Sequence, residues 1–458
     1  MPDLLDPLAG AGDADALLGG TAWLHACVRF EVQLVHALAS QQLVSAESAA
    51  AAEGLLHARL DVAAIADAGR AGGNPVIPLV KRLGALADAA SDGTSGDLHV
   101  GATSQDVLDS AAMIVAGQVI AQVGRDLATL VRLLARLAEL HRGTPMAGRT
   151  LGQHASPVTF GLVVSGWLGG ILAARARLLA VGDSLPVQYG GAVGSRAILR
   201  DTIAQRRPDA DAEPIVAAVL RSLADGLGLR DSAPWQSNRM PIVELGSALA
   251  GVVGAIGSMA ADIAVLSRTE IAEVAERLAA GEGGSSAMPH KRNPVTSVLL
   301  VSAARRSPAL VATLFDALVT EDQRSSGAWH SEWQTLRELE RLAIEASATA
   351  AALAERLEVD AARMRSNVET TDGLIYSERV TAILAESIGK TDAFELVEAA
   401  ARESVQTSRP LQVVMAGRLA NHDDVVRSRV LAAFDPDNGL ESAGVIVDSV
   451  VARAKDLA

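Results

Sequence analysis

The stretch RDLATLVRLLARLAE, residues 125–139, sets the period on which the fold depends. Its apolar side chains recur every three or four residues, at Leu127, Leu130, Val131, Leu134, Leu137 and Ala138. The charged side chains fall mostly between these positions. Such spacing places an apolar stripe along one face of an α-helix and leaves the other face polar. The stretch therefore predicts a helix with one face buried in a larger helical assembly.

Similar long helical patterns continue along the chain, over residues 156–181, 241–279, 295–320 and 335–358. Together with the first pattern they predict a central bundle of five long helices over residues 106–358. Shorter patterns, interrupted by Gly and Pro, come before and after it. We therefore expect an all-α fold with an N-terminal helical domain, residues 1–105, and a C-terminal helical domain, residues 359–458.

The composition supports a helical core and excludes several classes of protein. Hydrophobic residues make up 49% of the 458 residues but aromatic residues only 3%, so Ala, Leu, Val and Ile must fill the core. A net charge of −14 has the wrong sign for binding nucleic acid or an anionic membrane. The single cysteine, Cys27, excludes an intramolecular disulfide and any metal site with several thiolates.

The longest uncharged run, residues 245–261, lies between Glu244 and Asp262. It is shorter than the ~20 apolar residues that a membrane span needs, and it is rich in Gly and Ser. We expect a helix buried among other helices, some of them from other subunits. The first residues show no basic segment followed by an apolar one, so no secretory signal is expected. These features predict a soluble, cytoplasmic protein with no membrane partner.

Two glycine-rich loops interrupt the predicted helices. The first, QYGGAVG at residues 188–194, lacks the G-x-G-x-x-G spacing of a dinucleotide-binding loop and has no βαβ unit around it, which favours a tight turn between helices. The second, GEGGSSAMPHKRNP, covers residues 281–294. Small residues at 283–286 let backbone N–H groups converge on an anion.

Charge strengthens the case for an anion at the second loop. Lys291 and Arg292 add two cations, Asn293 can cap the following helix, and Pro294 suits its first turn. The loop therefore favours a bound carboxylate or a developing oxyanion. On these residues alone, a flexible surface linker with basic side chains remains an alternative.

Residues 284–294, GSSAMPHKRNP, resemble the signature loop of the fumarase/aspartase superfamily. Two further segments in the same order support the resemblance, HVGATSQD at 99–106 and GRTLGQHA at 148–155. The resemblance covers nearly the whole chain. Within the superfamily the sequence is most similar to the bacterial 3-carboxy-cis,cis-muconate cycloisomerase family, on stretches that include WHSEW at 329–333.

The resemblance implies both an activity and an assembly. It implies an intramolecular lyase that closes 3-carboxy-cis,cis-muconate to 4-carboxymuconolactone through an aci-carboxylate intermediate, in the protocatechuate and β-ketoadipate route of aromatic degradation. It also implies a homotetramer in which three chains contribute to each active site. The expected partner is a small polycarboxylate substrate, and neither a metal nor an organic cofactor is expected.

The resemblance also assigns roles to individual residues. Ser285 is expected to deliver the proton, Lys291 to hold the charge of the intermediate, and His99 to be catalytic or structural. His154 remains a further candidate for the proton donor. Substrate binding is expected at Thr103, Ser104, Gln105, Arg149, Thr150, Gln153, Arg239, Ser286, Met288 and Asn293.

Two departures from the superfamily pattern bear on the substrate. Leu151 stands where lyases of the argininosuccinate and adenylosuccinate kind have a histidine, and leucine cannot transfer a proton. This favours the lactonising branch. Met240 and Pro241 follow Arg239 where an Arg-Asp-Arg series is expected, which removes a cation from the site. An adenylosuccinate lyase-type enzyme that releases fumarate, and a catalytically silent structural homotetramer, stay as alternatives.

Overall fold

The computed structural model describes residues 4–278, 283–284, 287–288 and 290–456, and it confirms an all-α fold. The chain forms two compact units, each built from three separate pieces. The first unit contains residues 1–126, 174–254 and 303–349, and the second contains residues 127–173, 255–302 and 350–458. The three-part domain division at residues 105 and 358 stays a prediction, since the units follow packing rather than chain order.

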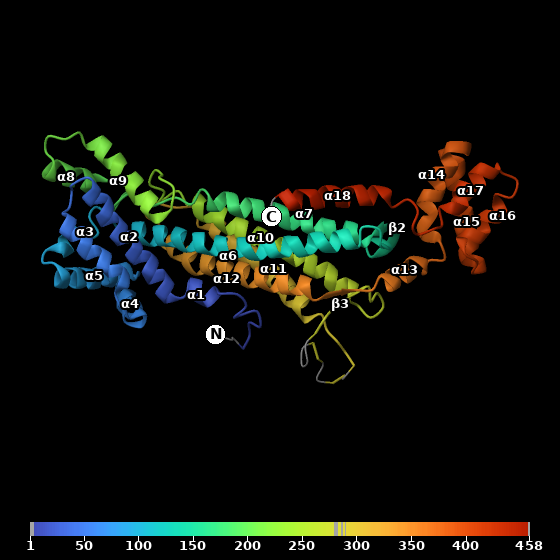
Figure 1. Ribbon diagram of the computed structural model, residues 1–458, viewed down its shortest axis with the longest axis horizontal. Helices are drawn as coiled ribbons and strands as arrows, with labels where there is room; N and C mark the ends of the chain where they lie inside the picture. The colour runs from blue at the N-terminus through green and yellow to red at the C-terminus, as the bar shows by residue number, and fades with distance from the viewer. Residues whose placement is uncertain (1–3, 279–282, 285–286, 289, 457–458) are drawn as a thin grey trace. The chain divides into compact units, whose positions relative to one another are not determined.

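Long helices supply much of the backbone of both units, and Figure 1 labels them. They are α6 (Ser104–Leu140), α7 (Phe160–Gly182), α10 (Met240–Leu266), α11 (Val295–Asp316) and α12 (Ala328–Glu355). Each long helical pattern of the sequence is thus occupied by a long helix. The stretch that sets the period lies within α6, where Leu127, Leu130 and Leu134 are buried as predicted.

The boundaries of two predicted helices are wrong. Residues 156–159 belong to a strand, because Pro157 lacks an N–H to donate and the β-branched Val158 and Thr159 favour extended backbone. The helix α7 starts only at Phe160, after the Thr159 hydroxyl accepts a hydrogen bond from the Leu162 N–H. Similarly, α10 stops at Leu266 rather than at residue 279, and the chain turns towards a short strand.

Besides its parts of the long helices, the first unit contains several shorter helices. These are α1 (Ala14–Leu18), α2 (Gly20–Ser40), α3 (Ala46–Glu53), α4 (Val62–Gly69), α5 (Val76–Ala90), α8 (Ala197–Arg206) and α9 (Ala212–Leu227), with 3-10 turns η1 (Gly54–His57), η2 (Arg70–Gly72) and η3 (Thr94–Asp97). The helix α2 packs against α9. Both have buried apolar residues at helical spacing, such as Leu34 and Leu38 in α2 and Val219 and Leu223 in α9.

The helix α12 carries a carboxyl group in the core of this unit. The Glu340 side chain is fully buried, and neither of its oxygens has a hydrogen-bond partner among the described residues. Burial raises the pKa of Glu340 to about 8, and the charge of Arg337 only partly opposes this. The folded protein therefore favours the neutral acid.

Glu340→Gln is expected to stabilise the protein in a pH-dependent way. Because the pKa rises from its ordinary 4.5 to about 8 on folding, wild-type stability falls as pH increases through that window, whereas the amide does not titrate. Melting temperatures at pH 5, 6.5 and 8 should show a gain that is largest at pH 8 and nearly absent at pH 5. A gain of equal size at every pH would contradict this account.

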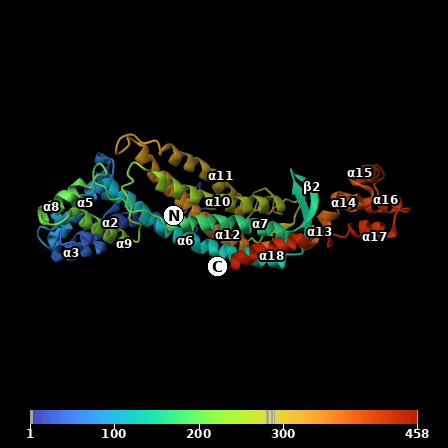
Figure 2. The same cartoon turned by 90° about the horizontal axis from the view of Figure 1, so that it is seen from above.

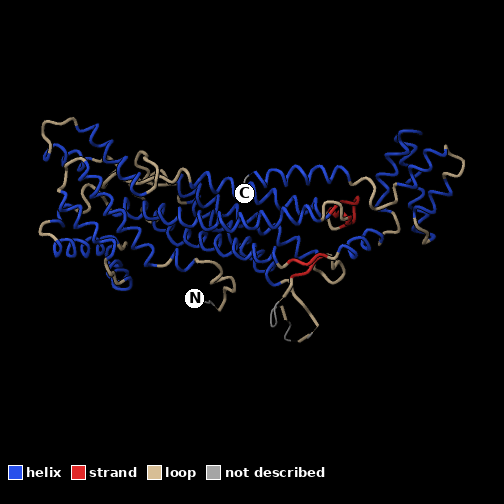
Figure 3. The backbone as a smooth tube through the Cα atoms, in the orientation of Figure 1, coloured by secondary structure: helices blue, strands red, loops and turns tan. Residues whose placement is uncertain are grey.

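The second unit contains short strands, coloured red in Figure 3. Strand β1 (Pro145–Thr150) pairs antiparallel with β2 (Gln153–Thr159), and β3 (Val274–Glu276) pairs antiparallel with β4 (Leu357–Val359). Its other elements are α13 (Ala361–Glu369), η4 (Leu374–Tyr376), α14 (Ser377–Ile388), α15 (Lys390–Thr407), α16 (Leu411–Arg418), α17 (Asp424–Ala432) and α18 (Glu441–Asp456).

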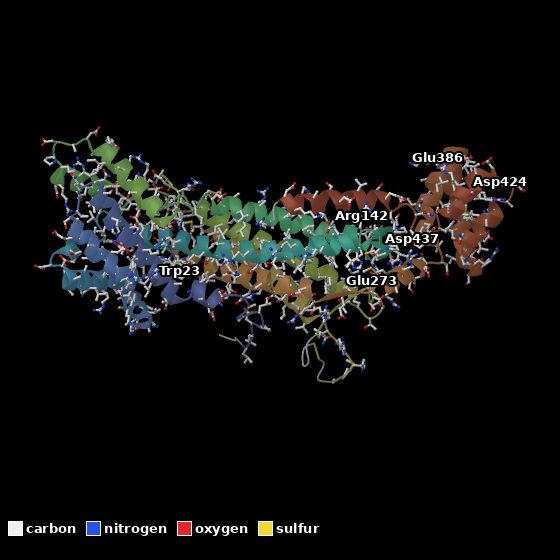
Figure 4. All side chains as sticks on the ribbon, in the orientation of Figure 1. Trp23, Arg142, Glu273, Glu386, Asp424 and Asp437 are labelled. Atoms are coloured by element: carbon white, nitrogen blue, oxygen red, sulfur yellow. The ribbon has the colours of Figure 1, made fainter. Side chains whose placement is uncertain are left out.

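The helices α14 to α17 gather in one cluster, visible in Figure 2, around a core that includes Val380, Val397, Leu411 and Met415. The helix α18 instead contacts the C-terminal end of α6 and the residues just after it. Two ion pairs fasten it there. Arg142, labelled in Figure 4, pairs with Asp448 at 2.7 Å, and Lys455 pairs with Glu139 at 2.6 Å.

Four long helices of the described chain, α6, α7, α10 and α11, are long and apolar enough to cross a membrane by length and composition alone. Within the structure, 78% of the most apolar window of α6 is buried but only 22% of that of α11. Exposed apolar side chains on or just beyond α11 include Val298, Phe315 and Val319. The most apolar window of α11 is thus mostly left uncovered within the described chain.

Candidate active site

The first signature segment lies in the first unit, where it leads into α6. Asp106 in the first turn of α6 accepts a hydrogen bond from the Thr103 N–H at 2.9 Å, as in a capping box. It also accepts from the Gly190 and Gly191 N–H groups at 2.9 Å and from the Gln188 amide at 2.8 Å. Burial raises the pKa of Asp106 to about 6 although these four donors oppose it. The loop 188–194 is therefore a structural turn fastened to α6.

His99 precedes that turn and is held by Glu31 of α2. The ring Nδ1 lies 2.6 Å from Glu31 Oε1, and the His99 backbone N–H donates to Oε2 at 3.0 Å. Burial lowers the pKa of His99, but the hydrogen bond and charge of Glu31, helped by the charge of Asp106, outweigh it and raise the pKa above 6.5. No described residue hydrogen-bonds to Nε2, so this nitrogen is available to another group.

Gln105 and Thr103 are joined by an arginine that the sequence analysis missed. Arg324 donates from Nε to Gln105 Oε1 at 3.0 Å and from a terminal nitrogen to Thr103 Oγ1 at 2.9 Å, and it stacks on Trp329. Gln105 is fully buried and its amide nitrogen donates to the Gln236 carbonyl. Both ends of the Gln105 amide are therefore hydrogen-bonded within the protein rather than to a substrate. Ser104, at the start of α6, is half-buried.

Only its place five residues before the WHSEW stretch could have marked Arg324 in the sequence. The acidic and polar residues around it resemble an ordinary surface loop. In the structure it is partly buried and has no carboxylate partner among the described residues. It therefore places a positive charge beside the first signature segment.

The expected contact of Arg239 with a substrate carboxylate is not supported by its surroundings. The side chain is 2% exposed, and each of its three nitrogens donates to Asp109 or Glu332, at distances from 2.6 to 3.2 Å. Trp329 also donates to Asp109, at 2.9 Å. Because buried carboxylates bind the guanidinium along both edges, Arg239, the residue that precedes α10, joins α6 to α12.

The second signature segment forms the β1–β2 hairpin of the second unit. Leu151 and Gly152 occupy its two-residue turn with φ angles of +51° and +81°, the left-handed values that such a turn requires. Thr150 and Gln153 pair on either side of the turn and are exposed, and Leu151 is fully exposed. The predicted binding residues thus stand at a projecting tip.

Arg149, just before this tip, is held by the second unit itself. Its terminal nitrogens donate to the two oxygens of Glu273, labelled in Figure 4, at 2.9 and 2.7 Å. Glu273 is fully buried and also accepts from Asn367 at 2.8 Å. The pair competes with the predicted substrate contact of Arg149. The neighbouring His154 has a buried Nδ1 without a partner in the described chain, and burial followed by the charge of Arg149 lowers its pKa.

The third signature segment falls partly outside the described residues. Ser285 and Ser286, assigned to catalysis and substrate binding, lie outside them. Met288 and Lys291 are exposed, and Lys291 has no carboxylate partner in the described part of the chain. The Asn293 amide donates to the Gly283 carbonyl at 3.2 Å, alongside a backbone bond of 3.0 Å, so Asn293 closes the base of the loop.

The expectation that Asn293 caps the following helix is wrong. Glu276 of β3 accepts from the Thr296 and Ser297 N–H groups, at 3.1 and 2.8 Å, and from the Ser297 hydroxyl at 2.7 Å. The longer Glu276 side chain reaches the N–H groups of the first turn of α11, whereas the shorter Asn293 side chain is already hydrogen-bonded to the Gly283 carbonyl. The positive end of this helix dipole is thus balanced by Glu276 rather than left for a ligand.

The structure divides the candidate residues between its two units. The first unit brings His99, Thr103, Ser104, Gln105 and Arg239 together around the start of α6, and the second holds Arg149, Thr150, Gln153, Met288, Lys291 and Asn293. Among the described residues no group of three or more His, Cys, Asp or Glu side chains is placed to hold a metal ion.

A helical protein with these three segments in order is an enzyme of the fumarase/aspartase superfamily. A family model described as "Lyase" matches residues 20–307, and the chain belongs to that family.

Individual relatives cover almost all of the chain. It is 42% identical to a nitrosuccinate lyase of Streptomyces davaonensis, over 98% of this chain and 94% of that protein. It is 39% identical to a 3-carboxy-cis,cis-muconate cycloisomerase of Pseudomonas aeruginosa, over 98% and 96%. The crystal structure of the 3-carboxy-cis,cis-muconate lactonizing enzyme from Pseudomonas putida matches with a TM-score of 0.88 and 34% identity, over the whole of both chains.

Proposed function

We propose that this chain is an intramolecular lyase that converts 3-carboxy-cis,cis-muconate to 4-carboxymuconolactone in the cytoplasm, as a step of aromatic degradation. The observation that carries the choice is the exposed hairpin tip, where Leu151 takes the place of a histidine. A reaction in which the substrate supplies its own nucleophile does not need a proton-transferring side chain there. The full-length similarity to cycloisomerases supports the same choice.

The chemistry asks little of the protein beyond folding the substrate, neutralising charge and delivering one proton. A substrate carboxylate oxygen attacks a carbon of the diene, the C–O bond of the lactone forms, and electron density moves into the neighbouring carboxylate. Ser285 then delivers the proton to carbon, so the product is an isomer of the substrate. We assign the charge of the intermediate to Lys291.

Assembly into a homotetramer would complete the site. Thr150 and Gln153 at the projecting tip, and Met288 and Lys291 of the third segment, are exposed on their own unit. The uncovered apolar surface of α11 is suited to packing against other chains. We infer that each active site combines the first, second and third signature segments of three different subunits.

Local cations must overcome the net charge of −14, which repels a polycarboxylate. Arg149 and Arg239 are already paired with carboxylates, whereas Lys291 and Arg324 have no carboxylate partner among the described residues. We therefore assign substrate carboxylates to Lys291, Arg324 and the protonated ring of His99.

Arg324→Met is expected to raise KM by about 10- to 100-fold, because a charged hydrogen bond to a carboxylate is worth about 1.5–3 kcal/mol. The melting temperature should change little, since the hydrogen-bond partners of Arg324 in the described chain, Gln105 and Thr103, are both neutral. Steady-state kinetics measure the effect, with Arg402→Met as a surface control. An unchanged KM would remove Arg324 from the site.

The proposed function is tested by mixing the purified protein with 3-carboxy-cis,cis-muconate and following the ultraviolet absorbance of the diene. We expect the absorbance to disappear as the lactone forms. Binding without conversion would indicate a silent homotetramer, and release of fumarate from adenylosuccinate would indicate the other lyase type.

A second candidate is elimination from nitrosuccinate, favoured by the 42% identity to a nitrosuccinate lyase. Such a substrate has two carboxylates rather than three. This smaller negative charge suits a site in which Arg149 and Arg239 are already paired with carboxylates and Pro241 stands where an arginine is expected. Formation of fumarate and nitrite in equal amounts would identify this reaction.

A further inference from the structure

Glu31 is a buried carboxylate to which no role in the reaction has been assigned so far. It lies on α2, and its side chain is 1% exposed among apolar neighbours that include Cys27 and Val35. An ionised carboxylate in such surroundings is costly unless it is paired and hydrogen-bonded. Among the described residues, both of its hydrogen-bond partners belong to His99, which lies 68 residues further along the chain.

The two contacts fix both the backbone and the ring of His99. His99 has a φ angle of +57°, a left-handed value that is uncommon for residues other than glycine. The hydrogen bond from its N–H to Glu31 Oε2, at 3.0 Å, stabilises that backbone. The bond between Nδ1 and Oε1, at 2.6 Å, orients the ring and places a proton on Nδ1.

The opposite edge of the ring remains available. The His99 side chain is 24% exposed, and Nε2 has no partner among the described residues. The charged groups that act on the ring are Glu31 from α2 and Asp106 from α6, and both favour the imidazolium. The nearby Tyr189 hydroxyl is occupied by the Val100 carbonyl at 2.8 Å.

We propose that Glu31 is a positioning residue of the reaction, which holds the His99 ring so that Nε2 carries a proton and donates to a substrate carboxylate. This rests on the proposed function, since it needs the first signature segment to line the active site. The carboxylate–imidazole pair then acts as a preorganised donor. It differs from a flexible surface cation because Glu31 fixes the orientation of the Nε2–H bond and its protonation before the substrate binds.

The test compares Glu31→Gln with Glu31→Asp through the pH dependence of kcat/KM. Glutamine keeps the shape but not the charge, so the ionisation of His99 should move to lower pH by about one unit and kcat/KM at pH 7.5 should fall ~10-fold. Aspartate keeps the charge and should retain most of the wild-type profile. In a His99→Asn background, Glu31→Gln should have no further effect on the profile.

A second readout does not require activity. Diethyl pyrocarbonate acylates neutral imidazole, so the rate of His99 modification against pH, followed by mass spectrometry of peptides, reports its protonation. The midpoint should lie above 6.5 in the wild type and drop in Glu31→Gln. The matched control is Glu53→Gln, which removes the carboxylate partner of His36 on the surface and should leave His99 unchanged.

These outcomes separate the two proposals. If the wild type is inactive but the modification midpoint still drops in Glu31→Gln, the proposed function is rejected. The His99–Glu31 pairing would then stand, without a role in catalysis. An active wild type in which Glu31→Gln keeps both the pH profile and the modification midpoint would overturn the role of Glu31. A loss of activity that Glu31→Asp shares in full, without any change in profile, would also overturn it.

Discussion

Ser285→Ala is expected to lower kcat by roughly 10²–10⁴-fold, because it removes the group assigned to proton delivery. The superfamily resemblance assigns this role, and the surrounding loop supports it. Asn293 closes the base of that loop on Gly283, and Lys291, which has no carboxylate partner in the described part of the chain, adds a positive charge. A serine hydroxyl is a poor acid or base unless such charge lowers the cost of its alkoxide.

The measurement is single-turnover decay of the substrate absorbance, which separates chemistry from binding. Ser285→Ala should bind the substrate with little change in affinity, because the cations are intact. The matched control is Ser184→Ala, because in the described chain the Ser184 hydroxyl donates to the nearby Val181 carbonyl at the end of α7. If Ser285→Ala kept more than a tenth of the wild-type rate, the proton would have to come from another group, such as His154.

Arg239→Met is expected to destabilise the protein by about 3–5 kcal/mol, since it leaves two buried carboxylates without their cation. Asp109 and Glu332 are 3% and 2% exposed, and Arg239 fills the space between them. Burial already raises the pKa of Glu332 although Arg239 opposes it, so loss of Arg239 raises it further. The variant should therefore recover part of its stability as pH falls and Glu332 takes up a proton.

Denaturant unfolding at pH 5.5 and 8, at one protein concentration, measures both effects. The control is Arg142→Met, which breaks an exposed pair with Asp448 of similar length and should destabilise the protein far less, because water solvates both charges. The triple variant Arg239→Met, Asp109→Asn, Glu332→Gln should regain stability, because no buried charge remains. A loss for Arg239→Met as small as the control would show that these charges are not buried in solution.

The sequence predicts the fold well because the helical period is a local property. The spacing around Leu127 and Leu134 needs no tertiary information, and the long helices follow it. The errors fall where one residue changes the backbone, as at Pro157, or where two extended segments pair. The pairing of β3 with β4 joins residues more than eighty positions apart, which no local pattern reveals.

The candidate site shows a similar division. Motif spacing locates the segments that carry His99, Arg149 and Lys291, but it does not show which charges the protein has already paired. Arg149 and Arg239 look like ligands in the sequence and prove to hold Glu273, Asp109 and Glu332. Arg324 looks like a surface residue and lies against the first segment. Long-range partners decide these roles.

The most direct test of the central claim compares kcat/KM for two substrates, 3-carboxy-cis,cis-muconate and nitrosuccinate, at equal enzyme concentration. Products are identified by NMR spectroscopy. The proposed function predicts fast formation of the lactone from the muconate, without loss of any atom, and a value of kcat/KM at least a hundredfold higher than that for nitrosuccinate. Release of fumarate and nitrite from nitrosuccinate, with the muconate left unchanged, would contradict it.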